Sequence, residues 1–336
     1  MVKITFKNVG QGDSIIIEWS SNGIYKTAII DCNLFQSTNP ILEHIIKNNV
    51  KEIEFMILSH PHLDHFSGFH ELLSYCRKNN ITVKRFLHTA EVTPDFLKSA
   101  SRSLEADEKL LNLFLLLKTM QENQELSVNS IDDNPHLKIP LGDEFSMEIL
   151  APTLIEKNKY IRGVNYPFDE EDSTGNPNAN WLSTVLKIYN KNSSIILTSD
   201  AESTVFTKIG KKKNGRLGKD KIILAQIPHH GAKGNLNKTF WQMRKRYSTT
   251  FVIISVGENG YDHPSNNLIE FFTNTANYEV IRTDIKGVIQ NKTKKVAKIS
   301  KILDVFSENR TATIRKQLKG DKSFVLSGTT CKVEYQ

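Results

Sequence analysis

Apolar and polar residues follow two periods along this chain, and these periods predict its strands and helices. Alternation by two, or a short apolar run, predicts a strand, whereas apolar residues three and four apart predict a helix. The expected strands are residues 1–7, 14–19, 25–30, 55–58, 182–189, 194–198, 222–227, 251–255 and 279–281. One expected helix begins at Pro40, and three more cover residues 68–79, 105–125 and 238–246. This order of strands and helices predicts an α+β protein with a mixed sheet covered by helices.

The apolar run 55–58 leads directly into a dense group of potential metal ligands: His60, His62, Asp64 and His65. Imidazoles and carboxylates this close together must stay hydrated or find partners, and a metal ion satisfies them. Neutral imidazole and carboxylate bind zinc, and also iron or manganese. The spacing suggests two metals, because His60 and His62 can point to the same side of an extended segment while the other two lie in the following turn. The alternative is a His-rich surface loop.

Other strand ends carry the same kinds of side chain. Asp13 and Asp31 follow early strands, and later strands lead to Asp200, to the pair His229 and His230, to His263 and to Arg282. Strand ends at one edge of a sheet can converge even when they lie far apart in sequence. The sequence therefore predicts that partners of the His60–His65 motif come from the second half of the chain.

Together these residues resemble the metallo-β-lactamase-fold hydrolases, and among them the soluble hydrolase domain of ComEC-type DNA-uptake proteins. The resemblance rests on residues 9–13, the His60-x-His62-x-Asp64-His65 core, and residues 198–202, 228–231, 261–264 and 282–284. It covers residues 1–291, with 86–165 poorly matched. It implies a four-layer αββα sandwich with metals at one edge of the two sheets. Residues 86–165 are expected to be a partly helical insertion or lid, and 292–336 a basic C-terminal extension.

The resemblance also implies how two divalent ions, zinc or manganese, would be held. His60 and His62 would bind the first metal, Asp64, His65 and His230 the second, and Asp200 would bridge both. The alternative for Asp200 is the N-cap of a helix. His229 would then face the substrate, although the assignments of His229 and His230 can be exchanged.

Two metals about 3.5–4 Å apart would lower the pKa of a shared water toward about 7 and stabilise the attacking and leaving oxygens. Asp64 would orient the bridging hydroxide, and His263 would protonate the leaving oxygen or contact a phosphate. The alternative for His263 is an ordinary turn residue before proline. Asp13 would tie down its Gly-rich turn or support a metal ligand through a hydrogen bond, and Asp31 would support a metal ligand in the same way.

One part of the family pattern is absent. Many members supply a third histidine to the first metal from a Gly-His-x-Pro-Gly-like turn, and no such turn occurs here. Three histidines lie between the core and Asp200. His70 lies on an expected helix and His136 in a polar loop, and His88 follows an apolar run but comes early in the sequence. ComEC-type domains have an Asn/Ser stretch ahead of the Asp strand, as Asn178, Asn180 and Ser183 provide here. A weakly held first metal is therefore expected, with manganese as plausible as zinc.

Composition sets the compartment and the class of partner. The chain has 336 residues, enough for one large domain or two ordinary ones. Its three cysteines have no CxxC spacing, which favours a reducing compartment over disulfides or a thiolate metal site. The first residues alternate like a strand rather than a signal peptide, and no apolar run is long enough for a membrane span. These features predict a cytoplasmic protein without membrane contact.

The net charge of +7 is unevenly distributed. Residues 208–221 contain seven Lys/Arg and one acid, 233–246 contain five and no acid, and 286–301 contain six and no acid. Positive charge concentrated in the C-terminal half indicates a polyanionic partner, unless these lysines are simply solvated loop residues. Arg282, Lys233 and Asn180 are the expected substrate contacts.

The function predicted from these features is metal-dependent hydrolysis of phosphodiesters in nucleic acid. Hydrolysis of a small molecule, such as a cyclic nucleotide, phosphocholine ester or lactone, is the first alternative, because a dimetal core does not choose its substrate. A catalytically silent binding subunit for a partner protein is the second, although the sequence does not specifically indicate such a partner.

Overall fold

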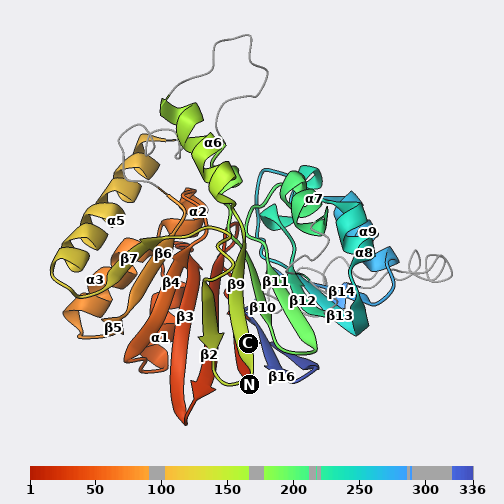
Figure 1. The fold of residues 1–336 in the computed structure, drawn as a ribbon, viewed down its shortest axis with the longest axis horizontal. Helices are drawn as coiled ribbons and strands as arrows, with labels where there is room; N and C mark the ends of the chain where they lie inside the picture. Colours follow the sequence, from red (N-terminus) through yellow and green to blue (C-terminus); the bar gives the residue numbers. More distant parts are fainter. Residues whose placement is uncertain are drawn as a thin grey trace, which may run out of the picture.

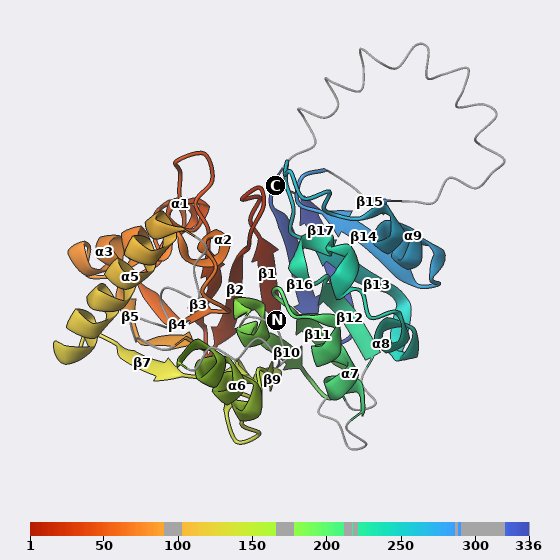
Figure 2. The same cartoon turned by 90° about the horizontal axis from the view of Figure 1, so that it is seen from above.

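The computed structural model describes residues 1–90, 103–165, 178–211, 217, 221–285, 288–289 and 320–335. Two sheets pack face to face, and helices cover both outer faces (Figure 1). Figure 2 shows α1, α3 and α5 on one side of the paired sheets and α7, α8 and α9 on the other. The predicted α+β class and its four-layer αββα sandwich are therefore confirmed.

The first sheet is built mainly from the N-terminal half of the chain. Its order is β17 (Thr330–Tyr335), β16 (Lys322–Ser327), β1 (Val2–Phe6), β2 (Ser14–Ser21), β3 (Ile24–Cys32), β4 (Glu52–Leu58), β6 (Arg85–His88) and β7 (Ser127–Ser130), with β5 (Thr82–Val83) beside β4. Strands β3, β4, β6 and β7 run parallel, β5 also pairs parallel with β4, and β17, β16, β1, β2 and β3 pair antiparallel in turn. The parallel strands therefore share one carboxyl edge.

The second sheet has a similar plan. Its order is β15 (Val288–Ile289), β14 (Tyr278–Arg282), β13 (Arg246–Ile254), β12 (Lys221–Gln226), β11 (Ser193–Leu197), β10 (Val185–Tyr189), β9 (Phe145–Ala151) and β8 (Lys138–Leu141). Strands β11 to β14 run parallel. Loops that follow parallel strands gather at one edge of a sheet, which is where open α/β sheets bind ligands.

Helices cover each sheet on one side only. The first sheet is covered by α1 (Pro40–Lys47), α3 (Phe69–Lys78) and α5 (Leu104–Glu122), and the second by α7 (Ser203–Lys211), α8 (Lys238–Met243) and α9 (Asn266–Asn274). Shorter elements near the sheet edge are α2 (Leu63–Phe66), η1 (Ala179–Leu182), η2 (His229–Gly231) and η3 (Lys233–Asn235), and α6 (Leu154–Asn165) precedes η1 in the chain. None of the helices among the described residues has the length and apolar character needed to cross a membrane.

Three apolar clusters fill the three interfaces of the sandwich. Strand β4 shows how one sequence serves two of them, because Met56 and Leu58 pack under the helices while Phe55 and Ile57 face the second sheet. Both faces of the strand are buried, which explains why its sequence is a continuous apolar run. The third cluster joins the second sheet to α7, α8 and α9 and includes Phe240 and Trp241.

Two expected segments contribute more to the sheets than the sequence indicated. Residues 86–165 contain α5 and α6 and also strands β6 to β9, which belong to both sheets. Residues 322–335, within the expected C-terminal extension, form β16 and β17, and β16 pairs with β1. Phe324 and Leu326 are buried between the sheets, so this pairing is fixed by apolar packing. The rest of that extension before Gly320, and most of the basic stretch 286–301, lie outside the described residues.

The expected helix 238–246 is shorter in the structure. Helix α8 ends at Met243, and β13 already begins at Arg246. The guanidinium of Arg246 donates to the carbonyl oxygens of Trp241, Gln242 and Arg244, and so closes the end of the helix. A cation that satisfies carbonyls at a helix end is a structural contact, which the count of charges in sequence did not reveal.

Candidate metal centre

The potential metal ligands meet at the carboxyl edge of the parallel strands. The run after β4 supplies His60 to His65, the loop after β11 supplies Asp200, and the turn after β12 supplies His229 and His230. Sharp reversals of the chain bring these side chains inward, since Asp31, Ser199, His229 and His230 have φ of 57°, 45°, 50° and 53°. Non-glycine residues with positive φ are uncommon, and such strained positions concentrate at functional sites.

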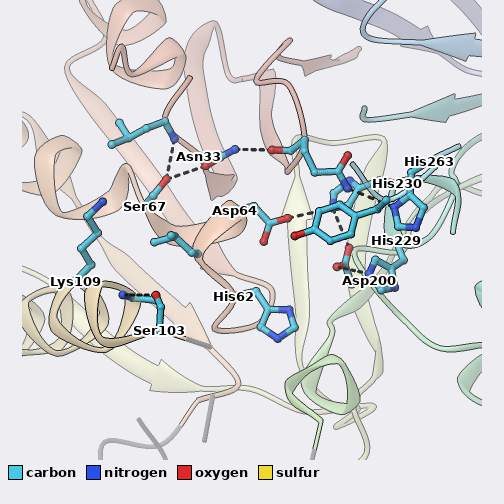
Figure 3. A pocket seen from close by; sticks show the side chains of 15 residues that line it. Asn33, His62, Asp64, Ser67, Ser103, Lys109, Asp200, His229, His230 and His263 are labelled. Atoms are coloured by element: carbon cyan, nitrogen blue, oxygen red, sulfur yellow. Dashed lines mark hydrogen bonds and ion pairs between the residues drawn. The ribbon is translucent and has the colours of Figure 1, made fainter. Parts of the chain in front are cut away.

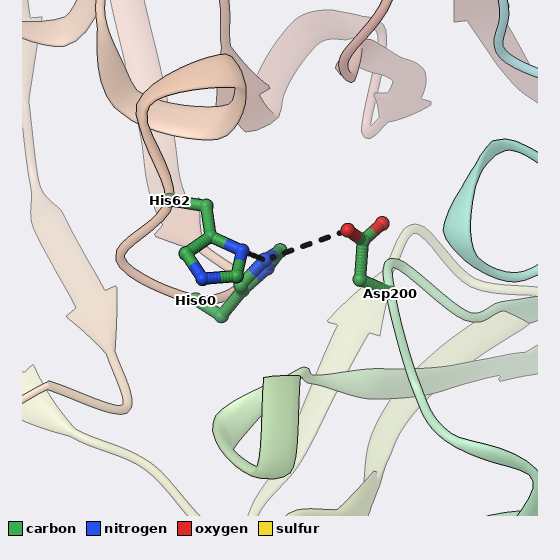
Figure 4. A group of neighbouring side chains, drawn as sticks. All are labelled: His60, His62 and Asp200. Atoms are coloured by element: carbon green, nitrogen blue, oxygen red, sulfur yellow. Dashed lines mark hydrogen bonds and ion pairs between the residues drawn. The ribbon is translucent and has the colours of Figure 1, made fainter. Parts of the chain in front are cut away.

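The first group of potential ligands contains His60, His62 and Asp200 (Figure 4). His60 Nε2 lies 2.9 Å from His62 Nδ1 and 3.7 Å from Asp200 Oδ2. The other ring nitrogen of His60, Nδ1, is 3.2 Å from the hydroxyls of Ser59 and Ser199. These two serines orient the ring so that Nε2 faces Asp200.

The second group contains Asp64, His65 and His230, and Asp200 lies beside it. Asp200 Oδ1 is 3.5 Å from His65 Nε2 and 3.4 Å from His230 Nε2. Asp64 Oδ2 is 3.5 Å from His230 Nε2. The two oxygens of Asp200 thus face different groups, Oδ2 toward His60 and Oδ1 toward His65 and His230.

Three buried atoms at the second group make no hydrogen bond within the described part of the chain: His65 Nε2, His230 Nε2 and Asp200 Oδ1. Leaving a buried polar atom unpaired costs roughly 1–3 kcal/mol. A divalent cation would accept electron density from all three, and a mixed set of imidazole and carboxylate donors suits zinc or manganese. The residues present therefore fit a metal ion.

The charges around Asp200 favour its ionised form. Burial raises the pKa of this carboxyl, but His230, His65 and His60 outweigh burial and hold the pKa well below its usual range. Burial lowers the pKa of His230, whereas Asp200 and Asp64 raise it to about 9. A buried carboxylate stays ionised only when positive charge lies close to it, so this group of carboxylates also stabilises a bound cation.

Asp31 orients one of the imidazoles, that of His65. Its carboxylate accepts hydrogen bonds from Ser59 N at 2.8 Å, Ser59 Oγ at 2.6 Å and His65 Nδ1 at 2.7 Å. A hydrogen bond to Nδ1 fixes the tautomer of His65 and leaves Nε2 directed at Asp200. Such carboxylate–histidine pairs commonly support metal ligands.

Asp13 is a second carboxylate near the same imidazole nitrogen, His65 Nδ1. Its Oδ2 is 3.9 Å from His65 Nδ1 and accepts a 2.8 Å hydrogen bond from Gln226 Nε2. Asp13, His65 and Asp200 also form a third group of potential ligands. The preceding Gly12 has φ +121°, and a Cβ there would lie 2.3 Å from Asp64 O, so glycine lets this loop rest directly on the motif.

The adjacent residues His229 and His230 occupy different surroundings. His230 is 2% exposed, its Nδ1 donates to Ser255 O at 2.8 Å, and it belongs to the second group. His229 has a side chain that is 28% exposed, and its Nε2 lies 3.6 Å from Asp200 Oδ2. His230 thus lies among the potential ligands, whereas His229 lies on the wall of the pocket.

A pocket of about 730 Å³ opens in front of the two groups (Figure 3). Its walls include the potential ligands His62, Asp64, Asp200 and His230, and the further polar residues Gln11, Asn33, Ser67, Ser103, Lys109, His229, Tyr261 and His263. The rings of His229 and His263 are 5.6 Å apart, so both face the pocket from the second sheet. Ser103 and Lys109 come from the beginning of α5, on the opposite side.

The expected substrate contacts do not line this pocket in the described structure. Arg282 makes two hydrogen bonds with Asp284, of 2.8 and 2.6 Å, and is occupied by that ion pair. Lys233 and Asn180 are likewise absent from the pocket walls. A charged neighbour two residues away can satisfy an arginine locally, and no count of basic residues detects this.

Several residues of the centre were not expected from the sequence. Gln226, Lys109 and Ser103 belong to no motif, and Ser199 lies in the run 198–202 without a role predicted for it, so only their tertiary neighbours reveal what they contact. Gln226 ends β12 just before the turn that holds His229 and His230, so its place at a strand end was the one available signal. Nothing comparable marked Lys109, which lies in an ordinary amphipathic helix.

None of the three histidines between the His60–His65 motif and Asp200 belongs to a group of potential ligands among the described residues. His88 ends β6, but its ring lies 5.2 Å from that of Phe114, under α5, and it is 7% exposed. His70 and His136 are exposed. The first group therefore contains two histidines and a carboxylate, one potential ligand fewer than the second group when Asp200 is counted in both.

The chain is similar to a known protein family and to several solved structures. Residues 8–148 match the model of the metallo-beta-lactamase superfamily. Similar solved structures include the metallo-beta-lactamase fold protein YhfI from Bacillus subtilis, 11% identical with a TM-score of 0.44 over 84% of this chain and 96% of that chain. A diphosphatase of the PhnP family is 9% identical, with a TM-score of 0.41 over 84% of this chain and 95% of that one. A long-form RNase Z from yeast is 11% identical, with a TM-score of 0.43 over 94% of this chain and 44% of that one. No curated protein matches the sequence.

Proposed function

Because the chain has the metallo-β-lactamase superfamily fold, we propose that it is a dinuclear metal-dependent hydrolase of phosphodiester bonds in nucleic acid. The observation that carries this proposal is the position of Asp200 between two groups of potential ligands. Its Oδ1 lies 3.4 Å from His230 Nε2, and its Oδ2 lies 3.7 Å from His60 Nε2. One carboxylate that serves both groups would hold two ions close together, as two-metal hydrolases require.

In this proposal His60 and His62 hold the first ion, Asp64, His65 and His230 hold the second, and Asp200 contacts both. Two zinc or manganese ions, when bound, supply a nucleophile at neutral pH and neutralise charge on the reacting phosphate. The remaining residues position these groups, since Asp31 orients His65 and the carbonyl of Ser255 orients His230. His229 and His263 face the pocket, where each can donate a hydrogen bond to the substrate.

The pocket walls favour an anionic substrate. Outside the metal groups, the polar side chains on the described walls are amides, hydroxyls, imidazoles and the ammonium of Lys109, with no carboxylate among them. These groups donate hydrogen bonds to phosphate oxygens. The resemblance to ComEC-type domains and the excess of basic residues in the C-terminal half support a polynucleotide as the substrate to test first. With this function we propose a cytoplasmic location, consistent with three free cysteines.

A small phosphoester or lactone is the second candidate, and the size of the pocket favours it. A volume of about 730 Å³ lies in the range typical of small-molecule sites. Arg282 is also engaged with Asp284 and Arg246 with backbone carbonyls, so these two cations are not available to hold a nucleic-acid backbone. The two candidates share the metal chemistry and differ in the length of substrate that the pocket admits.

The deciding experiment incubates the purified protein, loaded with zinc or manganese, with single-stranded DNA, duplex DNA, RNA and bis-p-nitrophenyl phosphate at low salt. Cleavage of a polymer, abolished by chelation, is the result expected for the proposed nuclease. Cleavage of the chromogenic ester alone would contradict the nucleic-acid substrate and favour the small phosphoester. No cleavage of any phosphodiester by protein with both metals bound would refute the phosphodiesterase proposal.

A further inference from the structure

We infer that Asn180 completes the first metal site through its side-chain oxygen; this inference rests on the proposed dinuclear function. The first group supplies two imidazoles and one carboxylate, His60, His62 and Asp200, so a four-coordinate ion there would have one position left for water or for a further protein ligand. Among the described residues no further histidine, cysteine or acid joins this group, so a protein ligand at that position would be of another residue type.

The η1 turn crosses the gap between the two strand ends that supply this group. After the turn, the backbone N and hydroxyl of Thr184 donate to Ser59 O at 3.1 and 2.9 Å, directly beside His60. Before the turn, Asn178 Nδ2 donates to Glu202 Oε1 at 3.2 Å, two residues beyond Asp200. Asn180 therefore lies between two anchors that belong to the two halves of the metal site.

The two faces of η1 have different surroundings. Ala179 and Leu182, three residues apart, are buried in the apolar cluster under the helices of the first sheet. Asn180 and Ser183 have the same spacing, and residues three apart share a face in a 3-10 helix. Both side chains are buried, at 3% and 1% exposure, although both are polar.

Asn180 Oδ1 and Ser183 Oγ make no hydrogen bond within the described residues. The Asn180 backbone is already fixed, because its N donates to Asn178 Oδ1 at 3.0 Å and its O accepts from Ser183 N at 3.1 Å. Burying a carbonyl oxygen without a hydrogen-bond donor destabilises the folded protein, and a cation bound to that oxygen would remove this free-energy cost. In Figure 4, η1 is the short green helical turn drawn below His60 and Asp200.

An amide oxygen in place of a third imidazole changes the preference of the site. The first metal would have two nitrogen donors, from His60 and His62, and two oxygen donors, from Asp200 and Asn180. Carbonyl and carboxylate oxygens favour harder ions, so this site is expected to discriminate less against manganese than a site with three imidazoles. The second site, with His65, His230 and two carboxylates, does not depend on Asn180.

The test measures metal binding directly, by titrating metal-free protein with Mn²⁺ and counting free and bound ions by electron paramagnetic resonance. We expect two bound Mn²⁺ in the wild type and an affinity for one of them lowered by roughly tenfold or more in Asn180→Ala. Asn180→Asp keeps an oxygen at the same place and should retain both ions, and Asn180→His should shift the weaker site toward Zn²⁺. Asn192→Ala, at an exposed turn between β10 and β11, is the matched control and should bind as the wild type does.

Equal Mn²⁺ binding by the wild type and Asn180→Ala, whatever the number of ions, would overturn the inference. So would a loss of binding in Ser183→Ala without one in Asn180→Ala. If Asn180→Ala fails to fold, the comparison of Asn180→Asp with Asn180→His decides by the same criterion, since unchanged metal preference contradicts a direct contact. Wild-type protein that binds two ions but hydrolyses no substrate would contradict the proposed function alone.

Discussion

Gln226 Nε2 donates a 2.8 Å hydrogen bond to Asp13 Oδ2, and this bond joins the second sheet to a loop of the first beside the metal centre. The oxygen of the same amide accepts from the backbone N of Thr198 at 2.9 Å and of Ser199 at 3.1 Å. One buried side chain thus holds the loop that carries Asp200 and the carboxylate that faces His65. Its amide is suited to this place because it donates to an acid and accepts from N–H groups at once.

Replacing Gln226 by leucine is expected to weaken metal binding and to lower stability. The substitution leaves two backbone N–H groups and Asp13 without partners, at roughly 1–3 kcal/mol for each unpaired group. Thermal unfolding and Mn²⁺ titration of Gln226→Leu measure the two effects. Gln242→Leu, at an exposed position on α8, is the control for the change of side chain. Unchanged metal affinity in Gln226→Leu would show that the bond does not position the centre.

Asp31→Asn is expected to lower affinity at the second site. The carboxylate now accepts three hydrogen bonds, and an amide has only one oxygen for the donors Ser59 and His65. Residues that support a metal ligand in this way typically contribute about 10–100-fold to metal affinity. Asparagine tolerates the φ of 57° at this position, so the backbone should keep its conformation. A metal titration that gives the wild-type constants would remove Asp31 from this role.

The residues of the metal centre differ in how far the sequence alone could identify them. His60, His62, Asp64 and His65 lie in one local run, so their chemistry is visible without a fold. Asp200 and His230 were identified from strand ends and a family resemblance, because convergence of distant strands is a tertiary property. Gln226 belongs to no motif, and its role depends on three partners that only packing brings together.

The fold was predictable where the apolar residues of a segment followed a single helical or strand pattern. Strand β4 and helix α3 have strong patterns, and their expected bounds, 55–58 and 68–79, lie within or close to the observed ones. β16 is different, because its place beside β1 depends on pairing across more than three hundred residues. Arg282 illustrates the same limit for charge, since Asp284 occupies a cation that the sequence suggested for substrate.

Asp200→Ala is expected to abolish both activity and binding of two metals while the protein remains folded. Among the described residues, Asp200 is the one whose oxygens face both groups, so its loss removes a potential ligand from each. Removing it also leaves Nε2 of His65 and Nε2 of His230 without their nearest carboxylate oxygen. Metal analysis, circular dichroism and the phosphodiester assay test this together. Folded Asp200→Ala that still cleaves substrate would exclude Asp200 from the centre.

Chelation is expected to destabilise the protein, and added Mn²⁺ or Zn²⁺ should reverse the effect. Asp13, Asp31, Asp64 and Asp200 gather around two groups of imidazoles, and three potential ligand atoms there lack a hydrogen bond in the described structure. An ion that binds only the folded state adds about 2.7 kcal/mol at a free concentration one hundred times its Kd. Melting temperatures measured against metal concentration test this. A melting temperature that is independent of chelator and metal would contradict the proposed centre.

Stability should also depend on His88 in mildly acidic solution, independently of the metal. Burial under α5, the largest effect, lowers the pKa of His88 from 6.5 to about 4. Between these pH values the unfolded chain binds a proton at His88 that the folded protein does not, so stability is intact above pH 6.5 and falls as pH decreases toward 4. Each pH unit in this window changes the free energy of unfolding by about 1.4 kcal/mol.

His88→Leu should remove this component, so its free energy of unfolding should decrease less than that of the wild type between pH 6.5 and 5.5. His136→Leu, at an exposed loop position, should follow the wild type. Parallel curves for the wild type and His88→Leu would mean that His88 is not kept neutral by burial.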